Sequence, residues 1–418
     1  MSVAPSNPVV ITGLGILCPV GIGVSAVWEA MLAGRSGVAR ITHFDPSPFT
    51  VQIAGEVKDF DPSNLAPAKE VRRMDRCTQL TLAAAVQAMD DAGLSRDSVD
   101  PEKTGIVIGS AAGGIQTLLE QHKVFLERGA RRLSPFFIQN MLVDSAAGQV
   151  AISLGLQGPN MAVVSACATG TQAIGEAAEL IRRGDAEVVL AGGAEAPIHP
   201  LIVAGFGVMN ALAKNNEQPE RASSPFTRRR DGFVLSEGAA VVVLETLEHA
   251  QARGAHIYAE VGGYSATNDA YDMAAVPEDG LMAAQAMRRA VRRAGLDPEG
   301  IDYINTHGTS TPLNDSAETR AIKAVFGEYA YRLAVSSTKS MTGHMMGASG
   351  AVETVVCALA IRDQIVPPTI NLDDPDPECD LDYVPNVARR TPVRATLSNS
   401  FGLGGHNASI VLKQLPGG

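Results

Sequence analysis

The sequence VVSACATGTQAIGEA (residues 163–177) runs from an apolar strand, through a cysteine, into a helix of small residues. A second stretch, SSTKSMTGHMMGASG (residues 336–350), has the same plan, with a histidine in place of the cysteine. Cys167 and His344 each stand three residues before a glycine, and a glutamate follows each glycine by six residues. We interpret this match as a weak internal duplication of one strand–turn–helix unit, which predicts two related halves that meet near residue 255.

Apolar runs rich in Val and Ile alternate with helical segments along the whole chain. Uninterrupted runs of this kind are typical of strands that are buried on both faces. The alternation predicts an α/β fold in which helices cover a mostly parallel sheet. The expected strands are residues 9–17, 104–108, 161–165, 187–191, 301–305, 334–337, 395–397 and 408–412. The expected helices are residues 25–32, 78–92, 115–128, 170–183, 281–294, 316–326 and 349–363.

The composition is that of a folded protein with a large core. Of the 418 residues, 45% are hydrophobic and 19% are charged. At roughly 100–200 residues per domain, this length predicts two or three units or one large fused core. The 45 Asp and Glu outnumber the 34 Lys and Arg, which gives a net charge of −11. That charge argues against a nucleic-acid-binding protein, and an acidic partner would need a local basic patch.

No apolar run approaches the roughly 20 residues that span a bilayer, and the start MSVAPSNPVV lacks the basic and apolar regions of a signal peptide. We therefore expect a cytoplasmic protein that does not associate with membranes. The five cysteines are an odd number without a CxxC pair, so we expect reduced thiols and no bound metal or disulfide framework. Four of them lack a reactive context and are interpreted as structural: Cys18, Cys77, Cys357 and Cys379.

Cys167 stands where a predicted strand meets a predicted helix. The N-terminus of a helix lowers the pKa of a thiol, and Gly170 would let another group approach closely. This setting is typical of a nucleophile. The alternative that Cys167 is structural stays open, because free cysteine is among the residue types most often buried.

The segment INTHGTSTPLND (residues 304–315) ends a predicted strand in a polar loop that contains His307. Folds of the α/β class bind ligands at the carboxyl ends of strands, although a lone histidine can equally be structural. Lys339 and His344 share one glycine-punctuated turn. With Cys167, the two histidines form a set suited to acyl transfer. Other polar side chains close to His307 in sequence are Thr309, Thr311, Asp315 and Glu318.

These three segments, together with GFVLSEGAAVVVLE (residues 232–245) and NSFGLGGHNAS (residues 399–409), closely resemble the β-ketoacyl-acyl-carrier-protein synthases of the thiolase superfamily. The nearest form is the type II condensing enzyme that elongates acyl chains. The resemblance runs from about residue 9 to residue 412, nearly the whole chain. It implies a five-layered αβαβα sandwich of two similar halves, residues 1–255 and 256–418, usually assembled as a homodimer.

The resemblance also implies the reaction, a decarboxylative Claisen condensation with malonyl-acyl-carrier protein in fatty-acid elongation. Cys167 would be the nucleophile that takes the acyl group from the carrier protein's phosphopantetheine thiol. His307 and His344 would hold the malonyl thioester carbonyl and stabilise the enolate that forms as carbon dioxide leaves. A charged network that orients these histidines is implied for Lys339, Asp315 and Glu318.

The glycine-rich loop is implied to supply part of an oxyanion hole. The two donors would be the backbone N–H groups of Cys167 and Leu403, and the flexible loop would move as substrate enters. A simple tight turn remains the alternative for this loop. Its residues are Phe401, Gly402, Leu403, Gly404 and Gly405. Thr309 and Thr311 match positions that contact the pantetheine arm.

Some positions depart from the family's pattern. The glycine-rich loop commonly carries Phe where this chain has Leu403, and Ala112 replaces a larger aliphatic residue at the wall of the acyl pocket. Ala274 and Ala275 stand where a hydroxyl residue commonly meets the pantetheine. We expect an acyl tunnel, still lined by Phe206, that admits long or unsaturated chains.

A basic cluster stands out in this acidic chain and consists of Lys69, Arg72, Arg73 and Arg76. The resemblance suggests that it docks the acidic carrier protein, although a solvated helix start explains it equally well. The arginines at 228–230 and at 288–293 are interpreted as ordinary surface charge. No resident cofactor is implied, because the substrates arrive on the carrier's phosphopantetheine.

Other functions share parts of this pattern. A ketosynthase subunit of a type II polyketide or aryl-polyene pathway would use the same chemistry. A chain-length partner that forms a heterodimer with a synthase generally lacks the nucleophile, whereas Cys167 is present. A degradative thiolase would need a second cysteine near the glycine-rich loop, and residues 399–409 contain none.

Overall fold

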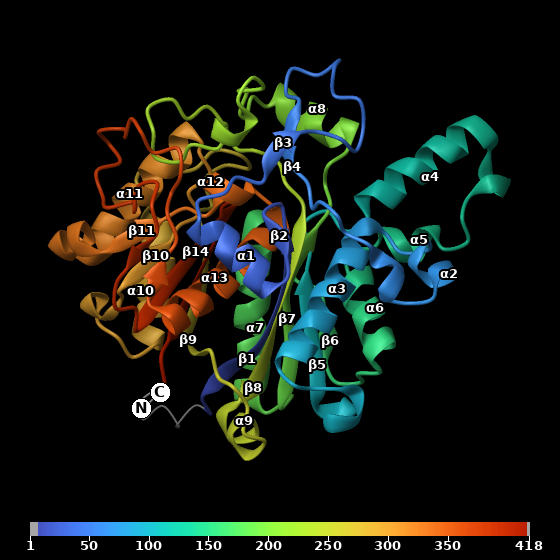
Figure 1. The fold of residues 1–418 in the computed structure, drawn as a ribbon, viewed down its shortest axis with the longest axis horizontal. Coiled ribbons are helices and arrows are strands. Elements are labelled where there is room, and N and C mark those ends of the chain that lie inside the picture. The colour runs from blue at the N-terminus through green and yellow to red at the C-terminus, as the bar shows by residue number, and fades with distance from the viewer. Residues whose placement is uncertain (1–6, 416–418) are drawn as a thin grey trace.

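A computed structural model describes residues 7–415 and shows five alternating layers of helices and strands (Figure 1). Two sheet portions face each other. One layer of helices lies between them, and one layer covers each outer face. The inner helices are α7 (Thr169–Arg183) and α13 (Ser349–Asp363). The outer helices are α3 (Arg76–Asp91) and α6 (Ser145–Leu154) on one side, and α10 (Leu281–Arg293) and α11 (Pro312–Phe326) on the other. The predicted αβαβα sandwich is confirmed.

The strand order is the same in the two halves. The first half contains β1 (Val9–Cys18), β5 (Thr104–Gly109), β6 (Asn160–Met161), β7 (Val188–Glu195) and β8 (Gly238–Thr246). The second contains β9 (Ala259–Asn268), β10 (Tyr303–Asn305), β11 (Ala334–Ser336), β14 (Ala395–Gly402) and β15 (His406–Lys413). Their orders are β6-β5-β7-β8-β1 and β11-β10-β14-β15-β9, so each half places its third, second, fourth, fifth and first strands in turn. The dividing point after residue 255 stays a prediction.

In each half four of the five strands run in the same direction, and one strand, β8 or β15, runs opposite to them. β5 is parallel to β6 and β7, and β10 is parallel to β11 and β14. β8, β1, β15 and β9 run antiparallel to their neighbours. The sheet of each half is therefore mostly parallel in strand direction, as predicted, and β8 and β15 are the two strands that depart from the prediction. Three residues join β14 to β15, and a connection that short has no room for the crossover that parallel neighbours need.

The repeat detected in the sequence exists in the structure, but in a different register. Short 3-10 turns precede both inner helices, at Ala166–Ala168 and Met346–Ala348, and the first residue of each has a positive φ, 50° and 46°. α7 starts at residue 169 and α13 at residue 349. Cys167 thus corresponds to Gly347, three residues beyond the His344 with which the sequence match paired it.

The sequences of the two inner helices, α7 and α13, are rich in small and aliphatic residues that suit a buried helix. Every residue of α13 from Ser349 to Ile361 is buried, which fits a helix that is apolar on nearly all sides. α7 buries its small and aliphatic side chains, and a left-handed glycine, Gly184, ends it. The core between the two sheet portions therefore consists mainly of these two helices and the strands they cover.

Other predicted elements agree with the structure apart from their ends, with two exceptions. Residues 162–165 are not a strand, because β6 ends at Met161, and the strands β8 and β9 were not predicted. Further helices are α1 (Val24–Leu32), α2 (Ala68–Val71), α4 (Ile115–Arg128), α5 (Phe137–Met141), α8 (Pro200–Val208), α9 (Leu247–Ala252) and α12 (Lys339–Thr342). Short strands are β2 (Gly21–Ile22), β3 (Val38–Arg40), β4 (Ile53–Gly55), β12 (Ile365–Val366) and β13 (Arg389–Arg390).

Within residues 7–415, no helix is long and apolar enough to cross a bilayer. The five cysteines are all free and buried. Part of the N-terminal stretch considered for a signal peptide, residues 1–6, lies outside the described residues.

The first turns of α7 and α13 touch at two glycines. A Cβ on Gly170 would lie 2.7 Å from the backbone nitrogen of Ala351, and a Cβ on Gly350 would lie 2.7 Å from that of Thr171. These distances are shorter than carbon and nitrogen atoms tolerate without a shift of the backbone. The small residues thus let the two halves bring their reactive turns together.

We predict that Gly350→Ala destabilises the protein by about 1–3 kcal/mol, because the added methyl group overpacks the helix crossing. Urea denaturation measures this change in the free energy of unfolding. Gly148→Ala is the matched control, since Gly148 lies inside α6 with nothing within 4 Å of its added Cβ. That variant should be neutral or more stable by up to about 1 kcal/mol. Equal behaviour of the two variants would contradict the close crossing.

Candidate active site

A cavity of about 390 Å³ contains the residues singled out by the sequence analysis. Its volume is in the range of small-molecule sites. The wall includes Cys167 from the turn before α7, His307 from the loop after β10, and His344 from the turn before α13. Other predicted residues in the wall are Phe206, Thr309, Thr311, Phe401, Gly402, Leu403 and Gly404. Both halves of the chain therefore contribute to one site.

The thiol of Cys167 is buried, with 6% of the residue exposed. Burial raises its pKa to about 12, while the charge of Lys339 and the backbone N–H groups of Leu403 and Cys167 itself act in the opposite direction. The expectation of a lowered thiol pKa was therefore wrong, because the loss of water outweighs the helix N-terminus. The same two N–H groups are those expected to form an oxyanion hole, and both lie close enough to the sulfur to lower the pKa of the thiol.

Two neutral histidines lie next to each other in the cavity wall, with their rings edge to face. Their ring centroids are 5.4 Å apart and their planes make an angle of 86°. Burial and the nearby charge of Lys339 hold the pKa of His307 and of His344 well below the usual value. Both imidazoles are therefore uncharged near neutral pH and can each donate one hydrogen bond.

The tautomer of His344 follows from its neighbours. Its Nδ1 lies 3.0 Å from the hydroxyl of Ser349, and that hydroxyl accepts the N–H of Met345 at 3.0 Å. The hydroxyl's own proton is available for Nδ1, and its donation there would place the proton of the imidazole on Nε2. Nε2–H is then the group that a substrate oxygen would meet. For His307, Nδ1 is buried and makes no hydrogen bond within the described chain.

Lys339 pairs with Glu353 and not with the carboxylates expected from sequence. Its Nζ contacts a carboxylate oxygen of Glu353 inside the protein, where both side chains are almost fully buried. Burial raises the pKa of Glu353 to about 7, and Lys339 opposes this rise. The prediction of a network between Lys339, Asp315 and Glu318 was wrong, because α13 places Glu353 beside the lysine.

Glu318 holds the backbone of the histidine loop. Its two carboxylate oxygens accept the N–H groups of His307 at 2.9 Å and Gly308 at 2.8 Å. The amide of Asn399 donates to the same carboxylate at 3.2 Å. Burial raises the pKa of Glu318 to about 7. Glu318 thus orients His307 through the main chain and makes no contact with the imidazole nitrogens.

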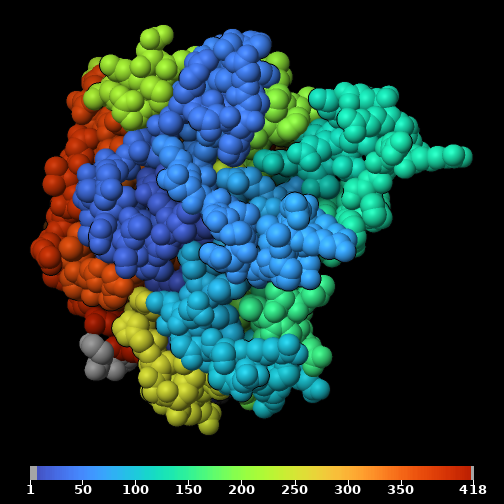
Figure 2. Space-filling view, turned by 45° about the vertical axis from the view of Figure 1, so that its right-hand side comes forward, coloured from blue at the N-terminus to red at the C-terminus, as the bar shows by residue number. Residues whose placement is uncertain are grey.

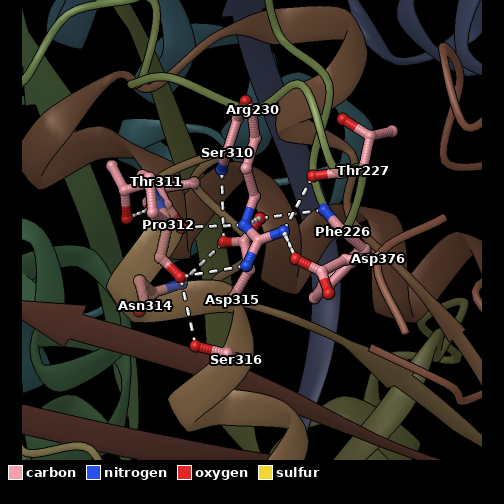
Figure 3. A network of polar contacts seen from close by, with 12 residues as sticks. Phe226, Thr227, Arg230, Ser310, Thr311, Pro312, Asn314, Asp315, Ser316 and Asp376 are labelled. Atoms are coloured by element: carbon pink, nitrogen blue, oxygen red, sulfur yellow. Dashed lines mark hydrogen bonds and ion pairs between the residues drawn. The ribbon is translucent and has the colours of Figure 1, made fainter. Parts of the chain in front are cut away.

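Asp315 belongs to a separate network around Arg230 (Figure 3). It accepts the N–H groups of Phe226 at 2.9 Å and Ser310 at 3.2 Å, and lies 3.8 Å from the Arg230 guanidinium. The interpretation of Arg230 as surface charge was wrong, because its side chain is only 5% exposed. Arg228 next to it remains exposed, as expected.

The glycine-rich loop lies directly over the cysteine. A Cβ on Gly402 would lie 2.8 Å from the carbonyl oxygen of Ser165 and 2.9 Å from the nitrogen of Cys167, so only glycine allows this approach. Gly404 and Gly405 have φ values of 82° and 75°. The loop is tied at its outer end, where the N–H of Gly404 donates to the carbonyl of Met273 at 2.9 Å.

The hydroxyls of Thr309 and Thr311 lie 3.0 Å apart in the cavity wall. Ala274 and Ala275 line the same wall, as does Phe206 from α8. Ala112, the other residue expected in the acyl pocket, is outside the lining of this cavity. Its N–H donates to the buried carboxylate of Glu195 at 3.0 Å.

Glu195 is a buried residue that the sequence analysis did not select. Its carboxylate accepts the N–H groups of Ala111, Ala112 and Gly347, and the hydroxyl of Ser110. It therefore fixes the loop that contains Ala112 to the turn that follows His344. A glutamate at the end of a strand of Gly and Ala was the signal in the sequence, since such a charge needs partners when buried.

Three of the four basic residues expected to dock a carrier are exposed. Lys69, Arg72 and Arg73 lie on and just after α2, beside the projecting segment that contains α4 and α5 (Figures 1 and 2). Arg76 is not available in the same way, because its guanidinium pairs with the buried Glu237 at 2.6 Å.

Two family descriptions match the chain, the N-terminal domain of beta-ketoacyl synthase over residues 6–250 and the C-terminal domain over residues 258–373. The chain belongs to the β-ketoacyl synthase family. It is a condensing enzyme, an acyltransferase. A relative from Coxiella burnetii, called 3-oxoacyl-acyl-carrier-protein synthase 2, is 49% identical over 97% of this chain and 98% of its own. A relative of the same name from Staphylococcus aureus is also 49% identical, with the same coverage.

Solved ketosynthases share the fold. One is described as a type II PKS acyl-carrier protein in complex with its ketosynthase, and it is 36% identical with a TM-score of 0.90. A beta-ketoacyl synthase from Burkholderia phymatum is 34% identical with a TM-score of 0.91. The matches cover 98% of this chain and 100% of each of these two chains.

We predict that the rate of alkylation of Cys167 by iodoacetamide rises about tenfold per pH unit between pH 7 and 9. The reason is that only the thiolate reacts, and a thiol with a pKa of about 12 stays mostly protonated over this range. Peptide mass spectrometry measures the rate at Cys167, with Cys167→Ala as the control. A plateau below about pH 8.5, the pKa of an ordinary thiol, would show that the helix N-terminus dominates over burial.

Proposed function

We propose that Cys167, His307 and His344 perform the condensation of an acyl group with malonyl-acyl-carrier protein, giving a 3-oxoacyl-acyl-carrier protein in fatty-acid elongation. The observation that carries this proposal is the meeting of one cysteine and two uncharged histidines in a single buried cavity. The relatives at 49% identity have the name of this activity.

The first step transfers the acyl group to the enzyme. The sulfur of Cys167 attacks the thioester carbonyl, and the thiol proton leaves with the phosphopantetheine sulfur of the carrier. The negative oxygen of the tetrahedral intermediate is stabilised by the N–H groups of Cys167 and Leu403, which lie beside the sulfur. A covalent intermediate divides a difficult reaction into two easier ones.

The second step forms the carbon–carbon bond. The malonyl thioester oxygen accepts hydrogen bonds from His307 and His344, and loss of carbon dioxide leaves an enolate on that oxygen. The enolate carbon attacks the acyl carbonyl on Cys167, the cysteine sulfur leaves as a thiolate, and a proton from solvent restores the thiol. Lys339 acts indirectly, since its charge favours the neutral form of both histidines.

No resident cofactor enters this reaction, because the thioester itself activates both carbons. Fatty-acid elongation is favoured over a type II polyketide pathway. The fatty-acid relatives are 49% identical, whereas the polyketide ketosynthase is 36% identical. One solved structure is described as a ketosynthase/chain length factor. A heterodimer with a chain-length partner is therefore the second candidate for the assembly of this chain.

A homodimer and a cytoplasmic location complete the proposal. β6 ends the sheet order of the first half, and both of its residues, Asn160 and Met161, are exposed. Unpaired strand edges favour pairing with another chain. Large apolar side chains are also exposed close to this edge, Ile152 on α6 and Val164 just after β6, and on the projecting helices, Leu126 on α4 and Ile138 on α5. A second copy of the chain would cover them.

Lys69, Arg72 and Arg73 are proposed to dock the acidic carrier protein. They are exposed in a chain of net charge −11, and complementary charge speeds the encounter of such partners. Arg76 is left out of this surface because it pairs with Glu237.

The function is tested by intact-mass spectrometry of the enzyme after incubation with acyl-carrier proteins of different chain lengths. We expect the enzyme to gain the mass of one acyl group, and to lose it when malonyl-carrier protein is added and a ketoacyl product longer by two carbons forms. Cys167→Ala should gain no mass. The chain length that acylates fastest distinguishes fatty-acid from polyketide intermediates.

His344→Ala separates the two steps in the same assay. It should still gain the acyl mass, but should lose condensation by about 100-fold or more, since one donor to the enolate is removed. Failure of the folded wild-type enzyme to take any acyl group would refute the proposed function.

Docking is tested with the charge reversals Lys69→Glu and Arg72→Glu. Each should raise the KM for acyl-carrier protein by about tenfold and leave the KM for a free acyl-pantetheine unchanged, because only the carrier has the opposing charges. The effect should shrink as salt increases. Arg332→Glu, an exposed arginine elsewhere on the surface, is the control. Equal effects of all three reversals would argue for net charge in place of a local surface.

A further inference from the structure

Arg230 is a buried arginine that the proposed chemistry does not use. It is the last residue of the loop 224–230. The next three residues, Asp231, Gly232 and Phe233, line the cavity. Only 5% of its side chain is exposed. Arginine is rarely buried unless its donors are satisfied, so the position of each donor identifies what the residue holds.

The guanidinium of Arg230 binds the first turn of α11 (Figure 3). Its Nε donates to the carbonyl of Thr311 at 3.3 Å, and Nη2 donates to the carbonyl of Pro312 at 3.0 Å. On the opposite side, Nη1 donates to the carbonyl of Thr227 at 2.7 Å and to the carboxylate of Asp376 at 2.5 Å. The planar group therefore fastens the start of α11 to two other loops.

The residue between the two threonines is fixed as well. Ser310 has a φ of 71°, a strained value for a residue with a side chain. Its N–H donates to Asp315 at 3.2 Å, its hydroxyl accepts the N–H of Ser224 at 3.0 Å, and its carbonyl accepts the N–H of Gly232 at 3.1 Å. Such strain persists only where neighbouring groups hold it.

We propose that Arg230 is a positioning residue, whose guanidinium holds the turn at Thr309, Ser310 and Thr311 so that both threonine hydroxyls face the phosphopantetheine arm. This inference rests on the proposed function, because it assumes a pantetheine-bound substrate. The two hydroxyls lie 3.0 Å apart in the cavity wall, and Arg230 bonds the backbone of Thr311 directly. Arg230 contacts none of the reacting groups.

Lysine cannot replace arginine here, because a single ammonium group does not match carbonyls and a carboxylate on two sides of a planar fork. In Arg230→Lys the turn should relax and the hydroxyls should lose their alignment. Binding of the pantetheine arm should weaken, while the cysteine and histidines keep their own supports. The expected signature is a change in KM with little change in kcat.

The experiment compares two acyl donors with the intact enzyme. Hexanoyl-pantetheine has the amides of the natural arm, whereas S-ethyl thiohexanoate has none. Arg230→Lys should raise the KM for hexanoyl-pantetheine by about tenfold and change kcat by less than about twofold. Acylation of Cys167 by S-ethyl thiohexanoate should stay within about twofold of the wild-type rate.

A double-mutant cycle with Thr311→Val tests whether Arg230 acts through the turn. In the Thr311→Val background, Arg230→Lys should raise the KM for hexanoyl-pantetheine by less than about twofold further, since the hydroxyl it positions is already absent. Additive effects of the two substitutions would overturn the proposal, as would equal losses with both acyl donors.

Two controls keep the result clear. Arg228→Lys alters an arginine that is 60% exposed in the same loop, and its KM should equal that of the wild type. If Arg230→Lys does not fold, Asp376→Asn weakens the same anchor from its partly exposed side and should raise the KM in the same direction. If neither donor acylated the wild-type enzyme, that result would contradict the proposed function and not the role of Arg230.

Discussion

The site depends on the close crossing of α7 and α13. Gly170 and Gly350 allow the first turns of these helices to touch, and the turns immediately before them contain Cys167 and His344. Any larger residue at the crossing would push the two halves apart. Cys167 and His344 come from different halves of the chain, so their separation depends on this contact between helices. The glycine-rich loop after β14 then closes over the cysteine.

Around this crossing, buried carboxylates hold the main chain. Glu318 binds the N–H groups of the His307 loop, and Glu195 joins the loop that contains Ala112 to the turn after His344. A buried carboxylate is costly unless its oxygens are satisfied, so each fixes the position of the backbone around it. His307 and the turn after His344 are thereby held through their backbones, and Nδ1 of His307 has no hydrogen-bond partner among the described residues.

Much of the fold could be predicted from the sequence, as could most of the residues that meet in the cavity. Periodic apolar segments gave the inner helices with little error, and motif spacing selected Cys167 and His307. Long-range pairings could not be predicted in the same way. Lys339 finds Glu353 because α13 passes beside it, and Arg230 lies in a run of three arginines that looks like surface charge. Burial, which also reverses the expected shift of the thiol pKa, is a property of the packed molecule.

The wall of the cavity lacks positively charged side chains among the described residues, and this suits the decarboxylation. Among the described residues, the wall has two carboxylates, Asp231 and Asp269, and neither a lysine nor an arginine. Lys339 is not part of the wall and pairs with Glu353 inside the protein. The malonyl carboxylate would therefore find no fixed positive partner, and its negative charge would gain little in the bound state. The thioester oxygen, by contrast, meets two neutral donors. Stabilisation is thus greater for the enolate than for the carboxylate that precedes it, which is the condition for accelerating the loss of carbon dioxide.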